Sequence, residues 1–226
     1  MISTEEGEDL LEAVRVSKKY GREAILDGVS FAVQEGESLA ITGLSGSGKS
    51  TLLSILGSLL RPTVGEVVFQ GQNLSSLSDN EKSRLRNDCF GFIFQHPQLI
   101  GSLSVLDNVL VPARLARKNN FEKRAKEVLH EMGLQDRLTY LPHQLSIGQK
   151  RRAAIARAIL LDPPVVFADE PTNDLDPGLA GWVGDFLFGL PGKGKTLVIV
   201  THDVNLAKKA LKTARITDGH LVSDYS

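Results

Sequence analysis

The sequence predicts an α/β fold in which helices cover a mostly parallel sheet. Two observations predict it. Short runs rich in β-branched residues alternate with helical patterns, and three of these runs are apolar throughout: Ser38–Thr42, Pro164–Ala168 and Thr196–Val200. Continuous apolar runs are typical of strands that are covered on both faces. With 226 residues, 42 % of them hydrophobic and 23 % charged, the chain has enough material for a large buried core.

The first part of the chain has a different strand pattern. Leu11–Val16, Ile25–Val33 and Gly65–Phe69 are partly alternating and are separated by turns that contain glycine. Alternation indicates strands with one exposed face, which antiparallel sheets tolerate. We therefore expect an antiparallel β layer at one edge of the fold.

The middle of the chain is mainly helical. Apart from a strand at Phe90–Phe94, it reads as three helices, the last of which ends at Gly133: Asp79–Asn87, Ser104–Ala116 and Phe121–Met132. We expect a single domain over residues 1–226, with a helical subdomain of about residues 79–149 inserted into the α/β core.

Composition narrows the classes of function. The 26 Lys and Arg residues balance 27 Asp and Glu residues, so the net charge of −1 gives no reason to expect a nucleic-acid partner. A single cysteine, Cys89, excludes an intramolecular disulfide and fits a reducing compartment. The longest apolar runs are far shorter than the roughly 20 residues of a membrane-spanning helix. We expect a cytosolic protein whose work at any membrane depends on other chains.

The segment that follows the strand Ser38–Thr42 fits the pattern G-x-x-x-x-G-K-[ST], here Gly43 to Ser50. Its glycines let backbone N–H groups surround phosphate oxygens at the positive end of the next helix. Lys49 is placed to reach the β- and γ-phosphates, and the Ser50 hydroxyl to ligate Mg²⁺. This predicts a P-loop NTPase core. Its further candidate nucleotide contacts are Gly43, Ser45, Gly46, Ser47, Gly48 and Thr51.

Two acids, Asp169 and Glu170, end the buried strand Pro164–Ala168. A parallel strand near the phosphate loop brings such carboxylates to the ligand crevice. We expect Asp169 to hold Mg²⁺ through water and Glu170 to act as general base for the attacking water. A kinase needs an acceptor site and a GTPase a guanine-reading Asn-Lys-x-Asp, which the sequence lacks.

The segment Leu145-Ser146-Ile147-Gly148-Gln149, which precedes a helical run, resembles the Leu-Ser-Gly-Gly-Gln signature of the ATP-binding cassette (ABC) family. Ser146 caps a helix whose first N–H groups and positive dipole face an anion. The resemblance implies that this anion is the γ-phosphate of ATP held by the opposite subunit, with Ser146, Gly148 and Gln149 as contacts.

Four more positions match the family. Tyr20 resembles the aromatic residue that stacks on adenine. Gln95 resembles the glutamine that contacts Mg²⁺ or the attacking water and senses the transmembrane partner. Asp176 resembles the acid of a loop that crosses the dimer interface, and His202 resembles the switch histidine that hydrogen-bonds the γ-phosphate.

Two stretches, Leu85–Leu99 and Ser104–Val109, look most like the lipoprotein-releasing and macrolide-efflux group (LolD/MacB-like). Two positions depart from the family pattern. Ile147 replaces the usual first glycine of the signature, where a β-branched side chain could crowd the partner's phosphate. Arg151 stands where glutamine is common. Both departures bear on the hydrolysis rate more than on nucleotide binding.

The resemblance implies an ATPase subunit that acts as a head-to-tail dimer on the inner face of the cell membrane and powers a separate permease. Lys150, Arg151 and Arg152 then belong to the signature helix rather than to a nucleic-acid site. One alternative is an FtsE-like regulator that signals through a membrane partner instead of transporting. Another is a soluble cassette protein of repair or translation, although such proteins usually carry two cassettes or a long coiled coil.

Overall fold

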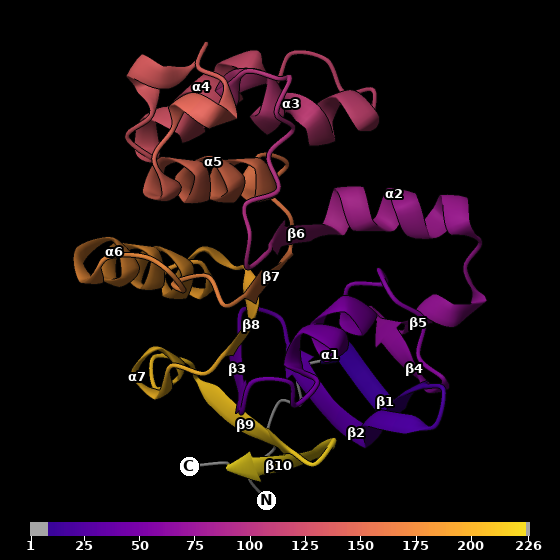
Figure 1. The fold of residues 1–226 in the computed structure, drawn as a ribbon. Coiled ribbons are helices and arrows are strands. Elements are labelled where there is room, and N and C mark those ends of the chain that lie inside the picture. Colours follow the sequence, from indigo (N-terminus) through magenta and orange to yellow (C-terminus); the bar gives the residue numbers. More distant parts are fainter. Residues whose placement is uncertain (1–8, 225–226) are drawn as a thin grey trace, which may run out of the picture. The chain divides into compact units, whose positions relative to one another are not determined.

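The computed structural model describes residues 9–224 and shows alternating strands and helices (Figure 1). The strands are β1 Asp9–Tyr20, β2 Glu23–Gln34, β3 Ser38–Gly43, β4 Val64–Phe69, β5 Gln72–Asn73, β6 Phe90–Ile93, β7 Val165–Asp169, β8 Thr196–Thr201, β9 Lys212–Thr217 and β10 His220–Asp224. The α-helices are α1 Lys49–Leu56, α2 Asp79–Cys89, α3 Val105–Leu115, α4 Glu122–Glu131, α5 Ile147–Ile159, α6 Pro177–Phe188 and α7 Val204–Ala207.

These elements form two compact units. Unit 1 comprises the chain up to Lys82 together with the chain from Phe188 onward, and unit 2 comprises Ser83–Leu187. The phosphate loop lies in unit 1, whereas the acid pair and the signature segment lie in unit 2.

Unit 1 contains a parallel arrangement that positions the phosphate loop. Strand β3 pairs in parallel with β8 on one side and with β9 on the other, and β10 adds to β9 as an antiparallel edge. Every residue of β8 is buried. The buried Thr196 hydroxyl accepts a hydrogen bond from Gly36 N–H and donates one to the Gln34 carbonyl, so its burial leaves no polar group unpaired.

The antiparallel layer of unit 1 forms a second sheet with strand order β2-β1-β4-β5. The antiparallel layer predicted at the edge of the fold is a separate sheet in the structure. Strands β9 and β10 were not predicted, because β9 alternates buried and exposed residues and lacks the continuous apolar run of β3 and β8.

In unit 2, β6 and β7 pair in parallel, and Ile93 lies opposite Ala168. Helix α5 packs against β6, α3 and α4. Gly91 permits the close approach of α5 to β6, because a Cβ at this position would lie 2.6 Å from the Ala158 carbonyl oxygen. The predicted helices at Ser104–Ala116 and Phe121–Met132 are present as α3 and α4.

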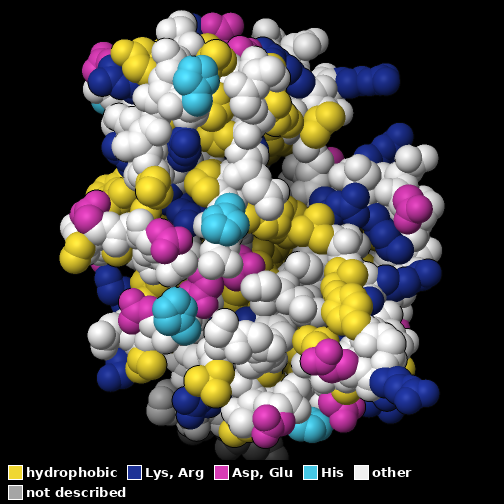
Figure 2. Space-filling model, viewed as in Figure 1, with side chains coloured by type: hydrophobic (Ala, Val, Ile, Leu, Met, Phe, Trp, Pro, Cys, Tyr) yellow, Lys and Arg dark blue, Asp and Glu magenta, His cyan; other side chains and the backbone are white. Residues whose placement is uncertain are grey.

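Helix α2 is mostly polar and has no fully buried residue. Lys and Arg side chains gather over it on the face shown in Figure 2. Acidic residues on the same helix, Asp79, Glu81 and Asp88, offset the charge of Lys82, Arg84 and Arg86. Asp88 of this helix forms an ion pair of 2.7 Å with Lys118.

Candidate nucleotide site

The phosphate loop connects the buried strand β3 to helix α1 in unit 1. Gly48 has a left-handed backbone with φ of 96°, and a Cβ there would lie 2.9 Å from the Ile25 carbonyl oxygen. Only glycine fits this position without strain. Gly46 lies in open space, with no heavy atom within 4 Å of where its Cβ would be. The loop therefore has the backbone shape that the motif predicts.

Two side chains of the loop, those of Lys49 and Ser47, carry buried polar groups suited to binding an anion. The Lys49 ammonium group is buried and donates to the carbonyls of Gly43 and Leu44, each at 2.9 Å. The Ser47 hydroxyl oxygen is buried and has no hydrogen-bond partner among the described residues. A phosphate oxygen at the loop would give this buried hydroxyl a hydrogen-bond partner.

Ser50 and Thr51 lie in the first turn of α1. Ser50 is exposed, and its backbone carbonyl accepts a hydrogen bond from the Ser54 hydroxyl at 2.8 Å. Ser45 is also exposed. The assignments of these hydroxyl groups to nucleotide and metal remain predictions.

Two more predicted residues lie in unit 1. Tyr20 ends β1 with 53 % of its surface exposed, and the Lys18 ammonium nitrogen lies 5.2 Å from the centre of its ring. His202 is exposed directly after β8, beside Asp203, which caps α7 by accepting from the N–H groups of Asn205 and Leu206. An exposed ring and an exposed imidazole suit ligand contacts, and their roles remain predictions.

In unit 2, the acid pair Asp169 and Glu170 lies at the carboxyl end of β7. Glu170 is only 8 % exposed and has a left-handed backbone with φ of 42°. Such a conformation costs energy in a non-glycine residue and is found where the surrounding structure enforces it, often at functional sites. Gln95 follows the neighbouring parallel strand β6 at the same end. The fold thus brings Gln95, Asp169 and Glu170 to one edge of this strand pair.

The signature segment forms the tip of helix α5. The Ser146 hydroxyl accepts from Gln149 N–H at 3.2 Å, and the Gln149 side-chain oxygen accepts from Ser146 N–H at 2.9 Å. This reciprocal cap confirms Ser146 as the predicted N-cap. Ile147, which departs from the family pattern, is 61 % exposed.

Steric packing explains why residue 148 is a glycine, which the sequence alone did not show. A Cβ at this position would lie 2.4 Å from the terminal Cδ2 atom of Leu179 in α6. Leu179 is placed in turn by Asp176, whose carboxylate accepts its backbone N–H at 3.0 Å. In unit 2 the signature tip and the Asp176 turn are therefore packed together through one leucine.

The residues present fit a nucleotide with Mg²⁺. Among residues 9–224, no group of three or more His, Cys, Asp or Glu side chains is arranged to hold a metal by itself. Mg²⁺ on a nucleotide needs no such group, since phosphate oxygens and water supply most of its ligands. The Ser50 hydroxyl in unit 1, and the Gln95 amide and Asp169 carboxylate in unit 2, each carry an oxygen of the kind that Mg²⁺ accepts as a ligand.

The sequence pattern of one family covers most of these features, since the pattern described as "ABC transporter" matches residues 26–173. The chain belongs to the ABC transporter family. The matched range includes the phosphate loop, Gln95, the signature segment and the acid pair, whereas Tyr20, Asp176 and His202 lie outside it.

Relatives of this ABC protein support its place in the LolD/MacB-like group. An uncharacterized ABC transporter ATP-binding protein of Methanocaldococcus jannaschii is 45 % identical over 94 % of this chain and 98 % of its own length. The lipoprotein-releasing system ATP-binding protein LolD of Bdellovibrio bacteriovorus is 43 % identical over 92 % of this chain and 98 % of its own length. The macrolide export ATP-binding/permease protein MacB of Hyphomonas neptunium is 42 % identical over 95 % of this chain, which spans 34 % of that protein.

Solved structures agree. A dimeric ATP-binding cassette in a post-hydrolysis state, bound to ADP and Pi, has a TM-score of 0.88 and 36 % identity, covering 96 % of this chain and 99 % of its own. A component of the cbiONQ ABC transporter complex of Clostridium perfringens has a TM-score of 0.83 and 29 % identity, covering 95 % of this chain and 88 % of its own. The predicted P-loop NTPase fold is confirmed.

The ABC protein is thus an ATPase and the ATP-binding subunit of a transporter system. No helix within the described residues has the length and apolar character needed to cross a membrane. Two of the three basic residues at the start of the signature helix make internal hydrogen bonds: Arg151 donates to the carbonyls of Phe94 and Gln95, and Arg152 donates to the carbonyl of Met132.

Proposed function

We propose that two copies of this chain close head to tail on ATP and thereby power a separate permease, in the manner of the LolD/MacB-like group. Each nucleotide would lie between the phosphate loop of one copy and the signature tip of the other. The observation that carries the proposal is the capped, outward-facing N-terminus of α5, with exposed Ile147 at its tip. A related solved cassette is a dimer bound to ADP and Pi, which supports dimerisation of the nucleotide-bound chain.

Residues of one copy would hold ATP and its metal. Tyr20 stacks on adenine, and the phosphate loop with Lys49 surrounds the phosphates, with contacts from Gly43, Ser45, Gly46, Ser47, Gly48, Ser50 and Thr51. Ser50, Gln95 and Asp169 would hold Mg²⁺, which would neutralise negative charge on the phosphate groups. From the other copy, Ser146, Gly148 and Gln149 face the γ-phosphate, and Asp176 lies at the interface.

Hydrolysis needs a base for the attacking water. Glu170 takes a proton as the water oxygen bonds to the γ-phosphorus and the bond to the bridging oxygen of ADP breaks. Burial and the enforced backbone conformation of Glu170 support this role, because both hold the carboxylate in one orientation. His202 hydrogen-bonds the γ-phosphate. Loss of that group removes the bridge between the copies, and the dimer opens.

Glu170→Gln tests the assignment of the base. This variant keeps the shape of the side chain, so it should bind ATP as the wild type does and accumulate as an ATP-bound dimer, seen by size-exclusion chromatography with light scattering. Its turnover should fall by at least about a hundredfold. Full turnover in Glu170→Gln would refute Glu170 as general base.

The partner is identified by what co-purifies with the chain in mild detergent from the organism that encodes it. The relatives LolD and MacB are named for a lipoprotein-releasing system and for macrolide export. A permease with a large periplasmic domain would support transport by a subunit at the cytoplasmic face of the membrane. A membrane partner linked to cell-wall hydrolases would instead support an FtsE-like regulator.

A further inference from the structure

Helix α5 holds the segment that follows β6, residues 94–98, which we call the 94–98 loop. Arg151 is only 2 % exposed, and its two terminal nitrogens donate to consecutive carbonyls, that of Phe94 at 2.6 Å and that of Gln95 at 2.5 Å. One planar guanidinium group thus fixes the peptide at Gln95 in a bidentate manner.

A second arginine repeats this contact further along α5. Arg157 donates to the carbonyls of Gln98 at 2.9 Å and Pro97 at 3.1 Å. Burial lowers the pKa of both guanidinium groups from their ordinary values. The two arginines hold the 94–98 loop at both of its ends, and all of these residues belong to unit 2.

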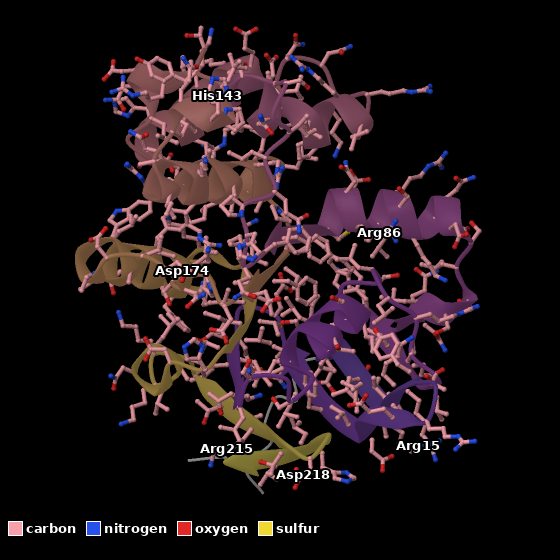
Figure 3. The ribbon with its side chains drawn as sticks, viewed as in Figure 1. Arg15, Arg86, His143, Asp174, Arg215 and Asp218 are labelled. Atoms are coloured by element: carbon pink, nitrogen blue, oxygen red, sulfur yellow. The ribbon has the colours of Figure 1, made fainter. Side chains whose placement is uncertain are left out.

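The placement of Arg151 is costly unless it serves the loop. Among the described residues it has no carboxylate within ion-pair distance, and its Nε is buried without a hydrogen-bond partner. Asp174, which follows β7 and is labelled in Figure 3, and Asp169 favour its charge from a distance, but burial outweighs them. An arginine buried in this way gains its hydrogen bonds from the loop carbonyls alone.

The chain remains fixed beyond the 94–98 loop. The fully buried Asn108 of α3 accepts from Ile100 N–H at 2.7 Å and donates to the carbonyls of Ile100, Leu103 and Ser104. Before the loop, β6 is in close contact with α5 at Gly91. From β6 to α3, side chains of the two helices therefore hold the backbone on both sides of Gln95.

We propose that Arg151 is a positioning residue for Gln95, because its two-carbonyl contact fixes the Gln95 backbone to the helix whose tip carries Ser146. When α5 moves, Gln95 moves with it as part of one body. This inference rests on the proposed function for the role of Gln95 in hydrolysis, while the attachment itself concerns only residues of unit 2.

The attachment is tested in the full-length chain with a spin label on the 94–98 loop. Cys89→Ser removes the single cysteine, and His96→Cys, at an exposed loop position, carries the nitroxide. Adding Arg151→Met should narrow the spectral lines, since the loop loses two hydrogen bonds. Arg152→Met is the matched control. It removes a guanidinium group from the same helix, but this group donates to the Met132 carbonyl and not to the 94–98 loop. Identical spectra for Arg151→Met and its parent would overturn the attachment.

The positioning role is tested by steady-state ATPase kinetics of the same arginine variants. We expect Arg151→Met to lower kcat by about tenfold or more, with the Kd for fluorescent ATP unchanged, and Arg151→Lys to recover part of kcat through one of the two hydrogen bonds. Arg152→Met should keep the wild-type kcat. Thermal unfolding of each variant shows that it is folded, and Arg151→Lys replaces Arg151→Met if the latter is not.

The spin-label spectra and the ATPase kinetics distinguish failure of the proposed function from failure of the positioning role. If the wild type did not hydrolyse ATP, the proposed function would fail, and the spin-label result would still decide the attachment. If the loop became mobile in Arg151→Met while kcat stayed at the wild-type value, the positioning role would be overturned although the attachment exists.

Discussion

Ser146 and Gln149 hydrogen-bond each other's backbone N–H groups, at 3.2 Å to the serine hydroxyl and at 2.9 Å to the glutamine side chain. Both side chains are therefore occupied in capping α5, and the N–H groups left over at the tip are those that can face an anion. These two hydrogen bonds restrain the conformation of the signature tip. This preorganisation favours a binding role for the tip.

Replacing this cap should cost stability and function together. Ser146→Ala removes the acceptor for Gln149 N–H and should lower the free energy of unfolding by about 1 kcal/mol, measured by urea denaturation. Ser104→Ala is the matched control, because Ser104 caps α3 by accepting from Asp107 N–H at 3.1 Å. The control should lose similar stability and keep ATPase activity, whereas Ser146→Ala should lose most of it. Equal ATPase losses would mean that the tip acts only through stability.

Gly148 and Leu179 should be energetically coupled. A Cβ on residue 148 would lie 2.4 Å from the Leu179 side chain. Gly148→Ala should therefore destabilise the fold less in a Leu179→Ala background than in the wild type, with a coupling energy of roughly 0.5–3 kcal/mol. A double-mutant cycle on the free energy of unfolding measures it. Gly181→Ala, on α6 with no neighbour within 4 Å, is the control and should show no coupling to residue 148. Additive effects of Gly148→Ala and Leu179→Ala would contradict the packing.

Acid should weaken the start of α3. Hydrogen bonds from the Ser104 hydroxyl and from Arg114 lower the pKa of Asp107. A carboxyl whose folded pKa is below its unfolded value of about 4 contributes stability above that pH and loses it as pH falls through the folded pKa. Asp107→Asn should therefore be less stable than wild type at neutral pH, with the difference shrinking on acidification. Glu122→Gln, which breaks an exposed pair with Lys126, should show a smaller difference at neutral pH.

The thiol of Cys89 should react slowly near neutral pH. Burial first, and the charge of Asp88 second, raise its pKa, while Lys118 lowers it. Little thiolate is then present, and the thiolate is the form that alkylates. The iodoacetamide labelling rate of Cys89 should rise at a higher pH than the labelling rate of a free cysteine peptide. Asp88→Asn should increase the labelling rate at a fixed pH. A rate equal to that of the peptide at pH 8 would contradict this.

Much of this molecule could be predicted from its sequence, and the reasons are local. Strands β3, β7 and β8 have continuous apolar runs, and Ser146 with Gln149 at the third helical position is a capping box. Each of these signals lies within a few consecutive residues, so no knowledge of the fold is needed to read them.

What the sequence did not show depends on contacts across long separations. Arg151 and the carbonyl of Phe94 are 57 positions apart, and a basic run gives no sign that one arginine is buried. The same holds for Gly148, whose neighbour Leu179 lies in another helix. The helical subdomain boundaries and the individual ligand contacts remain predictions.

Cross-linking of two copies tests the shared nucleotide site most directly. In a Cys89→Ser, Glu170→Gln background, one chain carries Ser45→Cys in the phosphate loop and the other Ile147→Cys at the signature tip; both positions are exposed. The account predicts a disulfide-linked heterodimer that forms with ATP and is lost without it. Nucleotide-bound chains that stay monomeric, each enclosing its own ATP, would contradict it.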